Sequence, residues 1–108
     1  MSIFRNLPGI NFAEGVQRVA GNEALYISLL KQFAQKHGDD LELLIQALEA
    51  GDEAQARQLL HTLKGVAGSI SLDDLYDAIC TFDECIDADK IAAMQKQMRI
   101  AKSSIGQL

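Results

Sequence analysis

A histidine, a lysine and two glycines lie close together in the segment QLLHTLKGVAGSI, residues 58–70. His61 is a candidate nucleophile, because free imidazole side chains have a pKa of about 6.5 and are largely neutral at pH 7. A phosphoryl group on the ring nitrogen would carry negative charge, which the ammonium group of Lys64 would stabilise. The chemistry that suits this pair is therefore the transfer of a phosphoryl group.

Gly65 and Gly68 are unfavourable in a helix, where each interior glycine costs about 1 kcal/mol relative to alanine. On a helical wheel of about 100° per residue, both lie within roughly 40° of His61. The apolar stripe of the same helix lies on the opposite side and contains Ala56, Leu59, Leu63, Ala67 and Ile70. Because both glycines face away from this stripe, the pattern predicts an outward surface that a partner protein approaches closely.

Other residues of the same segment extend this predicted docking surface. Arg57 and Gln58 precede His61 by about one helical turn and are candidate partner contacts. The other histidine, His37, falls on the apolar stripe of a different helix, which favours a partly buried structural role.

The residues required for several other kinds of chemistry are missing from the sequence. It contains neither a glycine-rich phosphate loop nor a readable Ser-His-Asp arrangement, and no segment is suited to bind a nucleotide. Its two histidines lie 24 positions apart without a cysteine or carboxylate set at ligand spacing, so we expect no metal and no cofactor. A phosphoryl group would have to come from a partner protein.

The bulk composition is that of an acidic globular domain. The 108 residues carry a formal net charge of -5 without a clustered basic face, which argues against binding to nucleic acid or to an anionic membrane. Cys80 and Cys85 would diverge by about 140° on a helix, so we expect free thiols, which suit the cytoplasm. The sequence shows no signal peptide and no apolar run of membrane-spanning length. We expect a cytoplasmic domain, either as a separate chain or at the cytosolic end of a membrane-anchored chain.

Apolar residues recur at spacings of three and four along most of the chain, which predicts amphipathic helices that must position His61. We expect an extended N-terminal segment over residues 1–10 and a helical bundle over residues 11–107. A short helix should follow Asn11, and a long helix should run from about 23 to 50 with a bend near Gly38.

Three further helices should begin near Asp52, near Ser71 and after the segment DAD at 87–89. Short connections between amphipathic helices require antiparallel neighbours. The predicted fold is all-α: an antiparallel up-down four-helix bundle with a short extra N-terminal helix, forming a single domain over residues 1–108.

The segment HTLKGVAGSI resembles the signature of histidine-containing phosphotransfer (HPt) domains, in which the histidine precedes Leu-Lys-Gly and small residues. LPGINFAEGVQRVAGNEALYISLLKQFAQKH is similar to the N-terminal half of such domains in bacterial hybrid sensor kinases. The likeness spans most of residues 7–86. The chain departs from the family at Ser71 and Leu72, where Gly-Ala is frequent, and this difference concerns the local turn.

The resemblance implies a phosphorelay carrier. His61 would accept a phosphoryl group from a receiver-domain aspartate and pass it to another receiver aspartate, assisted by Lys64. Gly65 would clear space for the receiver, and Gly68 would have a similar role. The Mg²⁺ needed for aspartyl phosphate chemistry would belong to the receiver, which is a domain of a response regulator or of a hybrid sensor kinase.

Two other classes of function compete with this interpretation. A helical adaptor would dock a partner through the same His61/Gly65 patch, with the histidine chemically idle. An independent enzyme, such as a kinase or phosphatase, is disfavoured because the sequence offers neither a nucleotide site nor a metal site. We expect a monomer that is not an enzyme on its own.

Overall fold

The computed structural model describes residues 7–84 and 87–108, apart from the side chain of Glu84. Within this part of the chain it contains six helices and no strand. The helices are α1 (Phe12–Arg18), α2 (Glu23–His37), α3 (Asp40–Glu49), α4 (Glu53–Ser69), α5 (Asp73–Glu84) and α6 (Ala88–Gly106).

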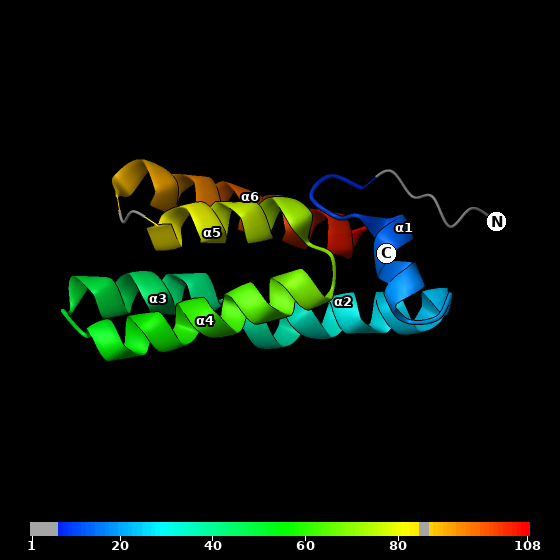
Figure 1. The fold of residues 1–108 in the computed structure, drawn as a ribbon, viewed down its shortest axis with the longest axis horizontal. Helices are drawn as coiled ribbons and strands as arrows, with labels where there is room; N and C mark the ends of the chain where they lie inside the picture. The colour runs from blue at the N-terminus through cyan, green and yellow to red at the C-terminus, as the bar shows by residue number, and fades with distance from the viewer. Residues whose placement is uncertain (1–6, 85–86) are drawn as a thin grey trace.

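The helices form an antiparallel bundle, with α2 and α3 following one another as a single rod beside α4, α5 and α6 (Figure 1). Helix α4 packs against α3 and α5, while α6 packs against α5 and α2. The short helix α1 lies at the end of the bundle where the chain also terminates (Figure 1). The predicted all-α, up-down four-helix bundle with a short N-terminal helix is confirmed.

The expected long helix from 23 to 50 is instead two helices, and this prediction needs correction. Helix α2 ends at His37 and α3 begins at Asp40, although Gly38 keeps helical dihedral angles of φ -59° and ψ -27°. The chain therefore continues in nearly the same direction through the break (Figure 1). His37 is half-buried against Phe33 and its Nδ1 lies 2.7 Å from Oδ2 of Asp40 across the break, which fits the predicted structural role.

Three of the four side-chain helix caps in the described chain lie where the sequence predicted a helix to begin. Each capping oxygen accepts a hydrogen bond from a backbone N–H three residues later, which satisfies a donor that the first turn leaves without a partner. The pairs are Asn11 with Glu14, Asn22 with Leu25, and Asp52 with Gln55. Gly51, at φ +74°, ends α3 in the left-handed conformation that glycine adopts readily.

Residues 7–10 are not extended, contrary to expectation. The N–H of Ile10 donates to the carbonyl of Leu7 at 3.2 Å, and Gly9 has φ +80°, as the third position of a type II turn requires. The turn is fixed to α6, because the hydroxyl of Ser104 donates to the carbonyl of Pro8 at 2.7 Å. This part of the expected linker therefore belongs to the bundle, while residues 1–6 lie outside the described chain.

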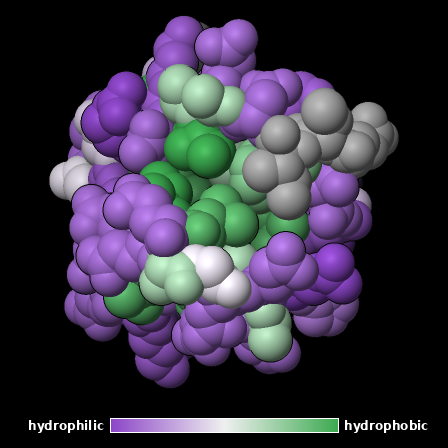
Figure 2. All heavy atoms as spheres, turned by 90° about the vertical axis from the view of Figure 1, so that its left-hand side faces the viewer, coloured by the Kyte–Doolittle hydropathy of each residue, from purple (hydrophilic) through white to green (hydrophobic). Residues whose placement is uncertain are grey.

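The core runs along the whole bundle and is built from the predicted apolar stripes. Its largest fully buried side chains include Tyr26, Phe12, Phe82, Leu30, Leu44, Leu63 and Met94. At one end, apolar side chains come to the surface within a polar rim (Figure 2). An apolar hollow lined by Leu44, Leu48 and Leu60, among others, lies between α3, α4 and α5.

The thiol of Cys80 is free and half-buried, whereas Cys85 lies outside the described residues. The apolar spacing of the helix predicted to begin near Ser71 reaches Ile86, which lies outside the described residues as well. Among the helices of the described chain, none combines the length and the apolar character that crossing a membrane requires.

Candidate functional site

Helix α4 presents His61 to solvent because its opposite face is held in the core. Ala56, Leu63 and Ala67 are buried on that inner face, and Leu63 and Ala67 are fully inaccessible. His61 lies on the outward face and is exposed, as the helical wheel predicted.

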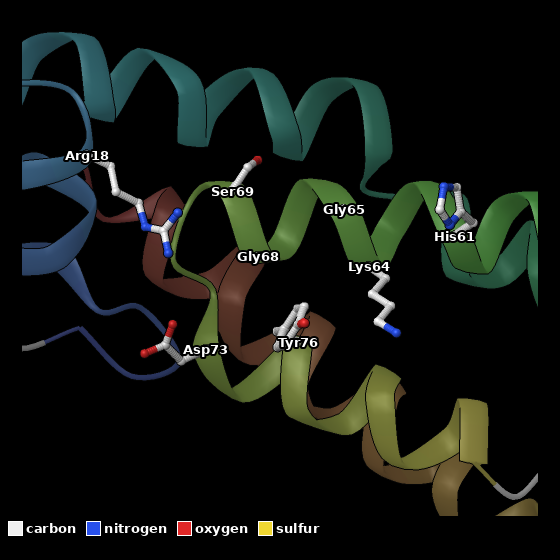
Figure 3. A pocket seen from close by; sticks show the side chains of 8 residues that line it. All are labelled: Arg18, His61, Lys64, Gly65, Gly68, Ser69, Asp73 and Tyr76. Carbon is white, nitrogen blue, oxygen red and sulfur yellow. The ribbon is translucent and has the colours of Figure 1, made fainter.

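A hollow of about 580 Å³ extends from His61 along α4 to its C-terminal end (Figure 3). Helix α4 supplies most of its wall, α5 supplies Asp73 and Tyr76, and α1 supplies Arg18. The lining residues are Arg18, His61, Lys64, Gly65, Gly68, Ser69, Asp73 and Tyr76.

Two further hollows adjoin His61. The first is lined by Arg57, Leu60, His61, Lys64 and Asp83, and the second by Glu53, Ala54, Arg57, Gln58 and His61. The structure thus brings together all six residues that the sequence singled out. His61 is the side chain that all three of these hollows share.

Lys64 is directed toward α5 and away from the imidazole ring (Figure 3). Its Nζ lies 3.6 Å from Oδ2 of Asp83, and the two side chains are 36% and 52% exposed. Both partners are well solvated, so the pair is weak and its ammonium group can be redirected at little cost. The side chain of Lys64 lines two of the three hollows that His61 lines, so its ammonium group is available to an anion bound to the ring.

The two glycines of α4 differ in their surroundings. A Cβ added at Gly65 would meet no atom within 4 Å, so this position is open to solvent, as predicted. A Cβ added at Gly68 would lie 3.0 Å from Cε1 of Tyr76 and 3.2 Å from Cδ1. Gly68 therefore serves packing inside the fold, because the ring of Tyr76 from α5 lies against it, although the helical wheel places this glycine away from the apolar stripe.

A polar cluster closes the far end of the main hollow, where α1 meets α5. Arg18 donates through Nε and Nη2 to Oε1 of Glu14 at 3.1 and 3.0 Å. The side-chain amide of Asn11 donates to Oδ2 of Asp73 at 3.1 Å, which ties the two helices together. Ser71 is buried in the turn between α4 and α5, and its hydroxyl lies 3.5 Å from Oε1 of Glu14.

The arrangement is suited to receive an anionic group on an exposed imidazole, beside the cations of Lys64 and Arg57. The part of the chain that the structure describes contains no group of three or more His, Cys, Asp or Glu side chains that could hold a metal ion.

A family model described as the Hpt domain matches residues 28–108. The chain belongs to the Hpt domain family. Searches of curated proteins and of solved structures gave no match.

Membership in the Hpt family confirms the predicted helical bundle and a role in histidine phosphotransfer within a phosphorelay. Hpt domains are phosphotransfer modules that interact with receiver domains, and they are not kinases with an ATP site. Ser71 lies in the turn where this Hpt domain departs from the Gly-Ala that is frequent in the family. It has φ +59°, in the left-handed region that glycine favours.

Sequence reasoning missed Ser69 of α4 and, from other helices, three further residues of the main hollow: Arg18, Asp73 and Tyr76. These three lie on α1 and α5, so the periodicity of α4 contains no signal for them. Asp73 lies in the first turn of the helix predicted to begin near Ser71, but nothing in its spacing indicates that α5 would bring it to the same hollow as His61.

Proposed function

We propose that His61 is the phosphorylated residue of this Hpt domain, accepting a phosphoryl group from a receiver aspartate and passing it to another receiver aspartate. The observation that carries this proposal is the position of His61, the exposed side chain where the three hollows along α4 meet. The other histidine of the chain, His37, is half-buried and lies beside Asp40 at the break between α2 and α3.

The transfer step follows from the chemistry of a neutral imidazole. The lone pair of the unprotonated ring nitrogen attacks the phosphorus of the aspartyl phosphate, forming a P–N bond as the P–O bond to the carboxylate breaks. The receiver carboxylate leaves with that electron pair, and the imidazole keeps its proton on the second nitrogen. Lys64 offers positive charge to the transferred group. Mg²⁺ is held by the receiver, and this chain supplies no cofactor.

We assign the docking of the receiver to the outward face of α4. Gly65 leaves room for a partner backbone to approach the helix, while Arg57 and Gln58 line a hollow on the other side of His61. Gly68 acts at this surface through Tyr76, which it seats in the wall of the main hollow. The partner is a receiver domain of a response regulator or of a hybrid sensor kinase, and the domain works as a monomer.

The test mixes the domain with a ³²P-phosphorylated receiver and follows the label. His61→Gln should abolish labelling. His37→Gln should preserve it, because His37 lines none of the three hollows around His61 and pairs with Asp40 at the break between α2 and α3. The adduct should be labile in acid and stable in base, as expected for phosphohistidine. Labelling of His61→Gln would overturn the assignment of this residue.

An adaptor function is the second candidate, and the open surface at Gly65 supports it equally. Binding of a receiver should survive His61→Gln under either function, whereas phosphoryl transfer is expected only from the relay carrier. A wild-type domain that binds receivers without accepting label from any of them would favour the adaptor.

A further inference from the structure

Asp83 stands out because it pairs with the lysine of the proposed site from a different helix. It lies near the end of α5, lines a hollow together with His61 and Lys64, and forms an ion pair with Lys64 at 3.6 Å. Nothing in the spacing of α4 pointed to it, since it is 22 positions from His61 in the sequence.

Before transfer, the ion pair favours a position of the Lys64 ammonium group beside α5, although the pair is weak. The side chain of Lys64 extends toward α5 and away from the His61 ring (Figure 3), although both residues line the same hollow. A phosphoryl group on His61 would carry about two negative charges and would compete with the single charge of Asp83 for this ammonium group. Lys64 therefore has two alternative anionic partners, of which only Asp83 is present before the transfer.

We propose that Asp83 is a positioning residue that retains Lys64 on α5 and thereby lowers the stability of the phosphorylated form of His61. The inference rests on the proposed function and concerns its regulation. In this role Asp83 keeps the transfer reversible, because a phosphohistidine that fully captured Lys64 would pass its phosphoryl group onward less readily. Asp83 makes no covalent bond and acts through Lys64.

The size of the effect follows from the exposure of the pair. Exposed ion pairs are weak, so release of Lys64 should shift the transfer equilibrium about two- to fivefold. The shift should shrink in about 1 M salt, where the screening length falls to about 3 Å.

The experiment measures the equilibrium ratio of phosphorylated domain to phosphorylated receiver for wild type, Asp83→Asn, Lys64→Gln and the double variant. Asp83→Asn should raise the ratio about two- to fivefold, and Asp83→Glu should restore it toward the wild-type value. In the Lys64→Gln background, Asp83→Asn should have little effect, because the residue through which it acts is gone. Asp77→Asn is the matched control, since it removes the same charge from α5 at a position about 120° around the helix.

Three outcomes would count against the inference. An unchanged ratio in Asp83→Asn would remove Asp83 from the relay. An equal shift in the Lys64→Gln background would show direct repulsion of the phosphoryl group, and a similar shift in Asp77→Asn would show a general charge effect. If wild type accepts no label at all, it is the proposed function that fails, so the two failures are distinguishable.

Discussion

Replacing Gly65 should separate the stability of the bundle from its ability to dock a receiver. Gly65 lies in the interior of α4, where glycine is less favourable than alanine by about 0.8–1.0 kcal/mol. An added Cβ meets no atom within 4 Å, so no clash offsets the gain. Gly65→Ala should therefore raise the free energy of unfolding by about 1 kcal/mol, which corresponds to an increase of about 4 °C in Tm for a domain of this size.

Docking should change in the opposite direction. If a receiver approaches α4 closely at Gly65, a larger side chain there must hold the two surfaces apart. Gly65→Gln should weaken receiver affinity by about tenfold or more, because overpacking a tight contact typically costs about 1–3 kcal/mol. Gly65→Ala should weaken it less, since it adds a single methyl group.

The assay pairs urea unfolding, followed by circular dichroism, with calorimetric titration against a receiver. Ala93→Gln is a suitable control, because Ala93 is an exposed position of α6 that lines none of the three hollows around His61. A loss of stability in Gly65→Ala would refute the open position assigned to this residue. Unchanged affinity in Gly65→Gln would refute its docking role while leaving His61 as the candidate phosphosite.

Two predictions concern the packing of α1 on the core. Burial, reinforced by the negative charges of Asp73 and Glu14, raises the pKa of Tyr26 well above its ordinary value of 10.0. The neutral Tyr26 side chain therefore contributes its full stability below about pH 10. Above that pH the free energy of unfolding should fall by up to about 1.4 kcal/mol per pH unit, because the unfolded chain loses the phenol proton first. Tyr26→Phe should reduce this slope in urea titrations at alkaline pH. Gly15→Ala should lower the free energy of unfolding by about 1–3 kcal/mol, because the added Cβ would overlap the buried ring of Tyr26. This ring cannot easily move away, since its hydroxyl donates to the carbonyl of Ile70 at 2.6 Å. Thermal unfolding of Gly15→Ala beside Gly65→Ala should give shifts of opposite sign, and equal shifts would contradict the packing described for α1.

Much of the fold could be predicted because its signals are local. A cap such as Asp52 acts within one helical turn, and the stripe that buries Leu63 repeats every three or four residues along one helix. The break at Gly38 was harder to see, since the apolar register of the two helices continues across it and the dihedral angles there remain helical. The turn at Gly9 was missed because a residue before proline is also typical of an extended segment, whereas a contact between Pro8 and Ser104 of α6 fixes the turn.

In the candidate site, too, the residues on a single helix were predictable and the residues from a neighbouring helix were not. His61, Lys64 and Gly65 belong to one face of one helix, so their spacing alone places them together. Asp83 and Tyr76 reach the site from α5, and only the packing of α5 on α4 determines that they do. Non-local contacts of this kind leave no periodic signal in a single sequence.

Gly65 and Gly68 show why the wheel alone is an incomplete guide to function. Both lower the intrinsic stability of α4 by about the same amount, and both lie near His61 on the wheel. At Gly68 the loss is offset within the fold, because the Tyr76 ring packs so closely against this glycine that an added Cβ would lie 3.0 Å from Cε1. At Gly65 no described atom of the chain lies close enough to offset it. A glycine that weakens its helix without a compensating contact inside the fold is most simply explained by a surface that a partner protein contacts. Gly65 therefore indicates the docking face more directly than Gly68 does.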